Sequence, residues 1–345
     1  MASQSSLVLT IFSTTGPLPT TTWTSKVDQI LPALAHEFTI STPNITSRFL
    51  DSPSPSSSSP VHRVHQLLLP TQSPATQPQC TSFLRTLAPQ TDSLSLSLVL
   101  TPLSPLHKPP ASSPSHPSRL AVFDMDSTLI QQEVIDELAR SLDLYASVSA
   151  ITEAAMRGEA PYTDFTASLQ ARVALLKGVE PGIWKHLREE VITFTPGARE
   201  LVRCLKAEGW YTAVLSGGFV DLAEWVKEEL GLDEAHANVL ETDEGGRLTG
   251  RIREGAKVVD GERKRELMER IKGEQDVGGD AVLAVGDGSN DLLMMGSAAL
   301  GVAFCAKPKV QERAPAKVNG GSLVDVLYLL GWTEEEIREV MARGK

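Results

Sequence analysis

Residues 120–128 read Leu-Ala-Val-Phe-Asp-Met-Asp-Ser-Thr, and this stretch decides the fold. The four apolar residues follow the polar Ser118 and Arg119 and are typical of a strand buried on both faces of a parallel sheet. Asp124 and Asp126 then stand at the carboxyl end of that strand, where open α/β sheets bind ligands. Burying two carboxylates is costly unless a cation or a reaction uses them. The spacing suits phosphoryl transfer, with Asp124 as nucleophile and Asp126 as general acid and base.

A second apolar run, at residues 281–285, ends in Gly-Asp-Gly-Ser-Asn-Asp at 286–291. Because the carboxyl ends of parallel strands meet at one edge of a sheet, we expect Asp287 and Asp291 to join the first two acids. Carboxylates from separate strand ends form the all-oxygen set that a hard cation prefers. The sequence therefore predicts a Mg²⁺ site whose ligands come from Asp124, Asp126, Asp287 and Asp291.

A third run, at residues 211–215, ends in Ser-Gly-Gly-Phe at 216–219. A hydroxyl followed by free backbone N–H groups, at the start of an expected helix, makes an anion site. Lys264 can supply the positive charge that a transferring phosphoryl group requires. These features predict that Ser216, Gly217 and Lys264 hold a phosphoryl group.

The four pieces, in this order, resemble the motifs of the haloacid dehalogenase-like phosphatases over residues from about 119 to 320. The resemblance to the phosphoserine phosphatase branch is more detailed. It rests on the Asp-Met-Asp-Ser-Thr-Leu-Ile motif followed by Glu133, on the Ser-Gly-Gly-Phe motif, on Met156 and Phe165, and on the stretch 168–177. The resemblance implies a Rossmann-like parallel sheet with an inserted helical cap. It also implies Mg²⁺-dependent hydrolysis of O-phospho-L-serine, the last step of serine biosynthesis.

The resemblance further implies how a substrate would be recognised. Glu133 would meet the amino group of phosphoserine, and Arg172 would meet its carboxylate. Met156 and Phe165 would form an apolar wall, and Asn290 would orient the phosphate or the nucleophile. This division is chemically sensible, because a zwitterionic amino acid needs one anion and one bidentate cation.

Several of these residues also have simpler interpretations. Ser216 could cap a helix, and Glu133 could be a first-turn acid favoured by the helix dipole. Lys264 competes with Lys257, Arg263 and Arg265, which are expected on a solvated face. The apolar cap residues are more often core than substrate wall.

A helical pattern separates the first strand from the rest of the core. Val134, Leu138, Leu142 and Tyr145 recur at helical spacing, which predicts a helical cap at about 133–194. A cap closes over the phosphate site, excludes water and admits only small substrates. Beyond it, glycines are expected to end helices 197–208 and 219–230, and residues 238–252 predict a β-hairpin.

The first third of the chain predicts a small α/β unit that resembles the amino-acid-binding (ACT-like) regulatory modules of some phosphoserine phosphatases. Its elements, in chain order, are a strand at 7–12, a helix at 27–35, a strand at 62–69, a helix at 80–87 and a strand at 94–100. A stabilising or vestigial unit would give the same pattern. The predicted domains are 1–104 for this unit, 105–118 for a Pro/Ser-rich linker, and 119–345 for the phosphatase with its cap.

Composition limits the partners. The net charge is −11, and residues 1–118 contribute +1, so the acidity belongs to the catalytic part and argues against nucleic-acid binding. No apolar run approaches the roughly 18 residues of a membrane span, and the three cysteines show no metal-ligand spacing. No basic region precedes the apolar patch at 7–12, so we expect a cytoplasmic protein without a secretory signal. A small-molecule substrate fits this composition, and a homodimer is compatible with it.

Three other functions stay open at this point. The chain could act on another small phosphomonoester, or pass the phosphoryl group to an alcohol such as homoserine. It could also be a phosphoprotein phosphatase, although the large cap argues against that. The third alternative is a non-catalytic amino-acid sensor built on the N-terminal unit, against which the intact acidic motifs weigh.

Overall fold

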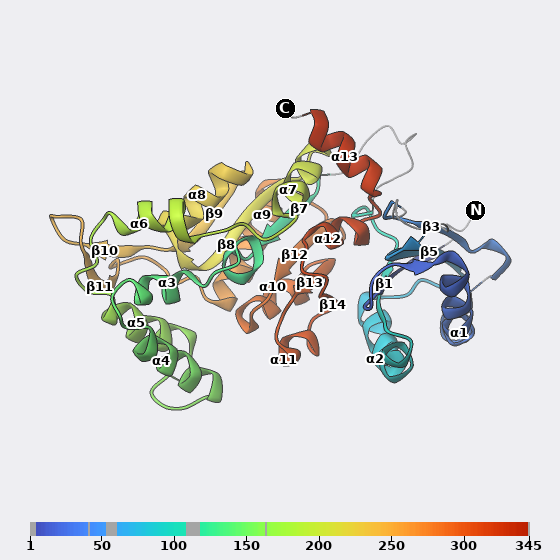
Figure 1. Cartoon of the computed structure of the whole chain (residues 1–345), viewed down its shortest axis with the longest axis horizontal. Helices are drawn as coiled ribbons and strands as arrows, with labels where there is room; N and C mark the ends of the chain where they lie inside the picture. Colours follow the sequence, from blue (N-terminus) through green and yellow to red (C-terminus); the bar gives the residue numbers. More distant parts are fainter. Residues whose placement is uncertain (1–4, 41, 53–60, 108–117, 163, 344–345) are drawn as a thin grey trace.

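The computed structural model describes residues 5–40, 42–52, 61–107, 118–162 and 164–343. The Ser/Pro tract at 53–60 and most of the predicted linker lie outside these ranges. Within them the chain forms two principal sheets, each with helices packed on it (Figure 1). The larger sheet carries the acidic motifs, and the smaller one precedes it in the chain.

The larger sheet is parallel throughout, in the order β14-β13-β12-β7-β8-β9. Its strands are β7 (Leu120–Phe123), β8 (Tyr211–Phe219), β9 (Glu234–Asn238), β12 (Val282–Gly286), β13 (Leu300–Phe304) and β14 (Ala316–Val318). Every residue of β7 is buried, as expected for a strand covered on both faces. Because β7, β8 and β12 are parallel neighbours, their motifs meet at one edge. The predicted Rossmann-like α/β core is confirmed.

Helices cover both faces of this sheet. One layer holds α7 (Ala198–Ala207), α8 (Val220–Leu230), α12 (Val324–Leu329) and α13 (Glu334–Arg343). The other holds α9 (Gly261–Glu274), α10 (Leu292–Ser297) and α11 (Pro308–Gln311). The predicted glycine ends of α7 and α8 are confirmed, since Gly209 and Gly231 both have a left-handed φ of 75°.

The segment between β7 and α7 forms the predicted helical cap. It contains α3 (Val134–Arg140), α4 (Tyr145–Arg157), α5 (Phe165–Leu175) and α6 (Ile183–His186), followed by a π turn at Leu187–Val191. The apolar spacing from Val134 to Tyr145 spans two helices, because the chain turns between them at Asp143, whose φ is 58°. The periodicity continues across that turn and therefore does not reveal it.

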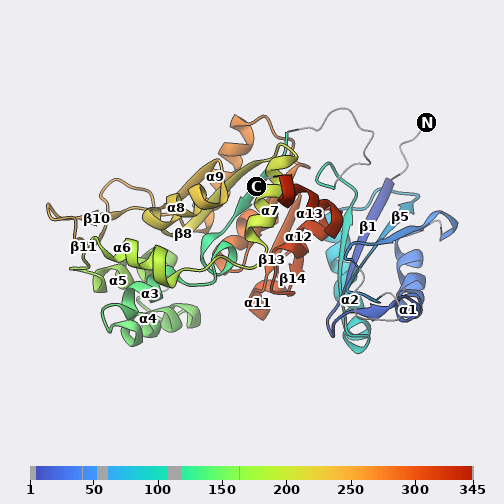
Figure 2. The same ribbon diagram turned by 45° about the horizontal axis from the view of Figure 1, so that its top comes forward.

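The predicted hairpin is also present, as β10 (Leu240–Thr242) and β11 (Leu248–Ile252). It leaves the core and packs on the cap, as Figure 2 shows. Leu248 exchanges two backbone hydrogen bonds with the cap, accepting from the Gly178 N–H at 2.8 Å and donating to the Val179 carbonyl at 3.0 Å. The cap is thus attached to the core at the hairpin as well as at its own two ends.

The smaller sheet is antiparallel, in the order β3-β5-β1-β6. Its strands are β1 (Ser5–Ser13), β3 (Thr46–Phe49), β5 (Val64–Thr71) and β6 (Leu96–Pro102), with α1 (Thr20–Phe38) and α2 (Gln77–Ser93) on one face. A short two-stranded ribbon, β2 (Leu18–Pro19) with β4 (Val61–His62), lies beside it. The β-α-β-β-α-β order is ferredoxin-like. The sequence reading missed β3, and the relation to amino-acid-binding modules stays a prediction.

The second face of the smaller sheet packs on α12 and α13 of the larger unit (Figure 1). Arg63 forms a two-pronged ion pair with the buried Asp325. Gln66 Nε2 donates to the Tyr328 carbonyl at 3.2 Å, and Arg48 donates to the Gly331 carbonyl at 2.8 Å. Both faces of the smaller sheet are therefore covered, one by α1 and α2 and the other by α12 and α13. None of the helices in the described part of the chain has the length and hydrophobicity that a bilayer crossing requires.

Candidate active site

Asp124 and Asp126 lie in the turn directly after β7, at the edge where β8 and β12 also end. The Asp124 carboxylate accepts a hydrogen bond of 2.7 Å from the Met125 N–H. Ser127 takes a left-handed conformation, with φ of 55°, that turns the chain sharply. Both acidic side chains line one pocket as a result.

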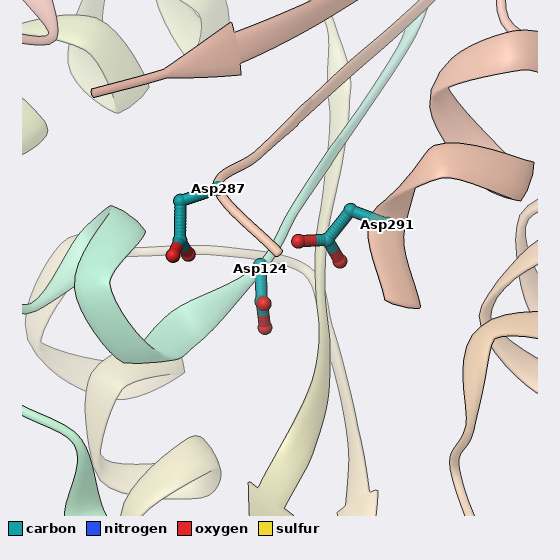
Figure 3. A group of neighbouring side chains, drawn as sticks. All are labelled: Asp124, Asp287 and Asp291. Carbon is teal, nitrogen blue, oxygen red and sulfur yellow. The ribbon is translucent and has the colours of Figure 1, made fainter. Parts of the chain in front are cut away.

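Asp124, Asp287 and Asp291 bring three carboxylates together, each with an oxygen within 4.8 Å of the others. Figure 3 shows them converging from the end of β7 and from the loop that follows β12. Thr128 donates a hydrogen bond of 3.1 Å to Asp287. Only glycine fits at position 286, because a Cβ there would lie 2.4 Å from the Asp291 carboxylate. The set offers a hard divalent cation the oxygen ligands that it prefers.

Lys264, on α9, lies inside this acidic cluster. Its Nζ is 2.8 Å from Asp124 and 2.6 Å from Asp291, and the side chain is fully buried. The flanking Arg263 and Arg265 instead form ion pairs near the surface with glutamates of the same helix. Of these three neighbouring cations, Lys264 is thus the one in the cluster, as the sequence predicted.

The charges in the cluster do not balance. Burial raises the pKa of Asp124, and the Asp291 charge raises it further. Burial likewise raises the pKa of Asp287 to about 7, again with a contribution from Asp291. Burial lowers the pKa of Lys264, but the two carboxylates beside it outweigh this and raise the pKa above its ordinary value. One lysine faces three acids, so a bound cation would relieve the remaining repulsion.

The Ser-Gly-Gly motif forms a bulge within β8. Leu215 pairs with His236 of β9 and Phe219 pairs with Asn238, so residues 216–218 oppose a single residue of the neighbouring strand. The Gly218 N–H donates to Ser216 Oγ at 2.8 Å. The expected helix starts four residues after Ser216, at Val220, so the interpretation of Ser216 as a helix cap is wrong.

Both glycines of the bulge lie against functional side chains. A Cβ at Gly217 would lie 2.9 Å from the Phe165 ring, and one at Gly218 would lie 2.6 Å from Asp126 Oδ2. Glycine is required here by the close approach of the cap and the acidic turn, because neither position has a positive φ.

A pocket of about 130 Å³ opens between the cap and this edge of the sheet. The predicted residues that line it are Asp124, Asp126, Glu133, Phe165, Arg172, Gly217, Asp287 and Asn290. Ser216, Lys264 and Asp291 are fully buried beside them. Met156 lies in α4, and its side chain is outside the described part of the structure.

The cap segment brings one acidic side chain, Glu133, and one basic side chain, Arg172, to the pocket. Glu133 accepts a hydrogen bond of 2.7 Å from the Ser127 hydroxyl. Burial raises the pKa of Asp126, and the nearby Glu133 charge raises it further. Burial lowers the pKa of Arg172, although the negative charges of Glu133 and Asp136 partly raise it again. The pocket thus holds one negative and one positive side chain from the cap segment, beside the edge of the sheet where Asp124 and Asp126 lie.

Two residues at this site were missed from the sequence. Ser127 had been counted only as part of the acidic motif, although its hydroxyl holds Glu133. Asn238 had been assigned only to the hairpin, although it is 1% exposed and bonds to Gly217. The sequence did not predict β9, which Asn238 ends, and the residue offered only one signal, a polar side chain at the start of the predicted hairpin.

The arrangement is that of a known family. The family model described as haloacid dehalogenase-like hydrolase matches residues 121–296. A probable phosphoserine phosphatase of Schizosaccharomyces pombe is 49% identical over 224 residues, which make up 65% of this chain and 73% of that protein.

Two solved structures are similar in fold. A phosphoserine phosphatase, solved as a phospho-aspartyl intermediate analogue, is 38% identical with a TM-score of 0.56, over 62% of this chain and 99% of that one. A probable phosphoserine phosphatase from Vibrio cholerae is 27% identical with a TM-score of 0.62, over 99% of this chain and 90% of that one. The second likeness therefore extends over the N-terminal unit. This chain belongs to the haloacid dehalogenase-like hydrolases.

Proposed function

We propose that this protein is a phosphoserine phosphatase, which hydrolyses O-phospho-L-serine to L-serine and phosphate. One observation carries the proposal. A single pocket holds the acidic turn on its floor and both Glu133 and Arg172 on its cap side. That arrangement matches a substrate with a phosphate at one end and a zwitterion at the other. The phosphoserine phosphatases to which the chain is similar support the assignment.

The phosphoryl group is transferred in two steps. In the first, an Asp124 oxygen forms a bond to phosphorus, the bond from phosphorus to the seryl oxygen breaks, and Asp126 gives its proton to that oxygen. In the second, a water oxygen forms a bond to phosphorus, the bond from phosphorus to the Asp124 oxygen breaks, and Asp126 takes the proton from the water. The raised pKa of Asp126 suits the first step, because the acid must be protonated when substrate arrives.

A Mg²⁺ ion fits the three-carboxylate cluster. Asp124, Asp287, Asp291 and the backbone carbonyl of Asp126 would hold it, either directly or through its water shell. When bound, the ion offsets the repulsion between an anionic nucleophile and an anionic phosphate. Lys264 neutralises part of the same negative charge. The phosphoryl oxygens accept hydrogen bonds from Ser216, the Gly217 N–H and Asn290.

The serine end of the substrate is held by the cap. Glu133 binds the ammonium and Arg172 binds the carboxylate, while Phe165 forms an apolar wall. A part for Met156 in that wall stays a prediction, because its side chain lies outside the described structure. Phosphate release should therefore be measured for four substrates: L-phosphoserine, phosphoethanolamine, phosphoglycolate and a phosphoserine peptide. We expect kcat/KM for phosphoserine to exceed the other values by about a hundredfold, because each charge-assisted contact contributes about 1.5–3 kcal/mol.

The cap residues supply the matching variants. Arg172→Gln should lower kcat/KM for phosphoserine by about 10–100-fold and change that for phosphoethanolamine little, since phosphoethanolamine has no carboxylate. Arg157→Gln is the control, because Arg157 is exposed and pairs with Glu153 and Glu159 on the cap surface. Activity on the peptide but not on free phosphoserine would indicate a phosphoprotein phosphatase. A different small phosphomonoester with the highest kcat/KM would keep the chemistry and replace the substrate.

The domain division is part of the same proposal. Residues 1–104 form one unit, 105–118 link it, and 119–345 form the phosphatase with a cap at about 133–194. The 38%-identical phosphatase, which aligns with 62% of this chain over 99% of its own length, supports a catalytic part that is complete without the first unit. Cytoplasmic location and a homodimer stay predictions.

A further inference from the structure

Asn238 is a buried polar residue to which the proposed reaction gives no role. It ends β9 and is 1% exposed. Its side-chain N–H donates to the Gly217 carbonyl at 2.8 Å, and its Oδ1 accepts from the Val259 N–H at 2.9 Å. The two partners fix which end of the amide is which, since a carbonyl can only accept and an N–H can only donate.

The first bond compensates for the bulge in β8. Residues 216–218 face one residue of β9, so part of the strand ladder is missing there. A buried backbone carbonyl without a partner would cost about 1–3 kcal/mol. The Asn238 side chain supplies the hydrogen bond that the neighbouring backbone does not, and Gly217 can keep its irregular conformation.

The same bond fixes a peptide plane in the phosphoryl site. The Gly217 carbonyl and the Gly218 N–H belong to one planar peptide group. Asn238 holds its oxygen, and Ser216 Oγ accepts from its N–H at 2.8 Å. Because a lone pair of Ser216 Oγ accepts this hydrogen bond, the Ser216 hydroxyl proton stays available for a phosphoryl oxygen. The orientation of this plane therefore orients the Ser216 hydroxyl directly. The Gly217 N–H belongs to the preceding peptide group, and the fixed plane constrains that donor through the Gly217 Cα.

The second bond reaches the helix that carries the catalytic lysine. Val259 immediately precedes Asp260, whose side chain caps α9 by accepting from the Arg263 N–H at 2.8 Å. Lys264 follows in the first turn of that helix. One buried amide thus joins the serine loop on one side to the start of the lysine helix on the other.

We propose that Asn238 is a positioning residue for phosphoryl transfer: it holds the Gly217 peptide and the start of α9 at the separation that lets Ser216, the Gly217 N–H and Lys264 act on one phosphoryl group. It does not touch the substrate. This inference rests on the proposed phosphatase chemistry but not on phosphoserine as the substrate.

Two substitutions separate the two bonds. Asn238→Asp keeps an oxygen for the Val259 N–H and replaces the donor to Gly217 by an acceptor at neutral pH. Asn238→Ala removes both bonds. A displacement of about 1 Å at a reacting group can cost about a hundredfold in rate. We therefore expect kcat to fall by about 10–100-fold in both variants, and the inhibition constant of inorganic phosphate to rise by at least about fivefold.

The measurement uses an aryl phosphate as well as phosphoserine, with Mg²⁺ present and each rate referred to the folded fraction. Gln66→Leu is the matched control, because Gln66 is also a buried, hydrogen-bonded amide, with partners Thr10, Tyr328 and Arg48, but lies where the N-terminal sheet contacts α12. It should lower the melting temperature without changing kcat or phosphate inhibition.

The outcomes are distinct. If both Asn238 variants lose thermal stability but keep kcat and phosphate inhibition within twofold of the wild type, Asn238 is only structural and the proposal is wrong. If Asn238→Asp alone keeps wild-type kinetics, the bond to Gly217 has no positioning role, and the proposal is also overturned. Failure of the wild type on phosphoserine, with aryl phosphate still cleaved, would count against the substrate and leave this test intact.

Discussion

Two of the ion pairs in the described part of the chain, each with a fully buried carboxylate, differ in the balance of charge around them. In the catalytic part, Lys264 faces Asp124 and Asp291, with Asp287 also close by. Where the smaller sheet packs on α12, the Arg63 guanidinium pairs with the Asp325 carboxylate, and Asp51 accepts from the Arg63 backbone N–H nearby. Both sets lie in low-dielectric surroundings, where an uncompensated charge is expensive. The excess of buried negative charge around Lys264 fits the proposed cation and phosphoryl site, whereas the Arg63 pair joins the two units of the molecule.

The surroundings of the two pairs support this distinction. The Arg63 guanidinium lies 5.7 Å from the Phe12 ring centre and 5.9 Å from that of Tyr328, so aromatic rings of both units flank it. The Lys264 cluster instead adjoins a pocket. The same kind of side-chain pair thus stabilises a contact in one region and leaves room for a ligand in the other.

Asp124→Asn should give the largest effect. It removes the nucleophile, and we expect kcat to fall by at least about a thousandfold. The same change removes one charge from an overcrowded set of acids, so the protein should remain folded, with an unchanged or higher melting temperature in chelator. Phosphate-release assays and thermal melts on one preparation test this. Retained turnover, or a lower melting temperature, would break the contrast with the structural pair.

Arg63→Met should act in the opposite sense, on stability and not on turnover. It leaves the Asp325 carboxylate, whose side chain is 1% exposed, without its counter-charge. We expect a loss of about 3–5 kcal/mol in the free energy of unfolding, with kcat of the folded fraction unchanged. Denaturant titration would measure the loss. A change below about 1 kcal/mol would show that the pair contributes little to the joint.

Asp325→Asn should cost less than Arg63→Met. The asparagine leaves no buried anion, and the Arg63 side chain, 30% exposed, can still reach water. We expect a loss of about 1 kcal/mol, the typical net value of a hydrogen bond. Comparing the two variants by the same denaturant titration isolates the cost of the unpaired carboxylate. Equal losses would mean that the contact surface, and not the charge, determines the stability of the joint.

The smallest effect should appear in the pH dependence of the chelated protein. The pKa of Asp287 is raised from 3.8 to about 7 in the folded state, so between these values the folded chain binds more protons than the unfolded chain. Stability from this group must then fall as pH rises from about 4 to 7. Asp287→Asn removes the titration and should flatten that slope in melts between pH 5 and 7.5. Added Mg²⁺ should raise the wild-type melting temperature most at the upper end. An identical slope in both proteins would contradict the assigned pKa.

The three strands that carry the motifs, β7, β8 and β12, could be predicted because they are largely buried and appear as apolar runs that end in motifs. β9 was not predicted, because its residues are mostly polar or small and only half-buried. β3 (Thr46–Phe49) was missed because three of its four residues are exposed, so it has no apolar run. Asn238 was missed because its role depends on a bulge in a different strand.

The joint between the two units could not be predicted either. Arg63 and Asp325 are 262 residues apart, and no local pattern connects them. By contrast, Lys264 could be singled out among three neighbouring basic residues because the order of motifs required a cation at that point in the chain.

The contact between Gly217 and Phe165 has a consequence for how substrate preference can change. The Phe165 ring of the cap rests on the backbone that is proposed to bind phosphate, so in that proposal this glycine sets the distance from the phosphoryl group to the wall. That distance limits the length of the alcohol that fits between them. Any side chain at position 217 would push the wall away and disturb the phosphate contact in the same step. A single substitution there cannot adapt the pocket to a longer substrate, and new specificity has to arise from the cap side alone.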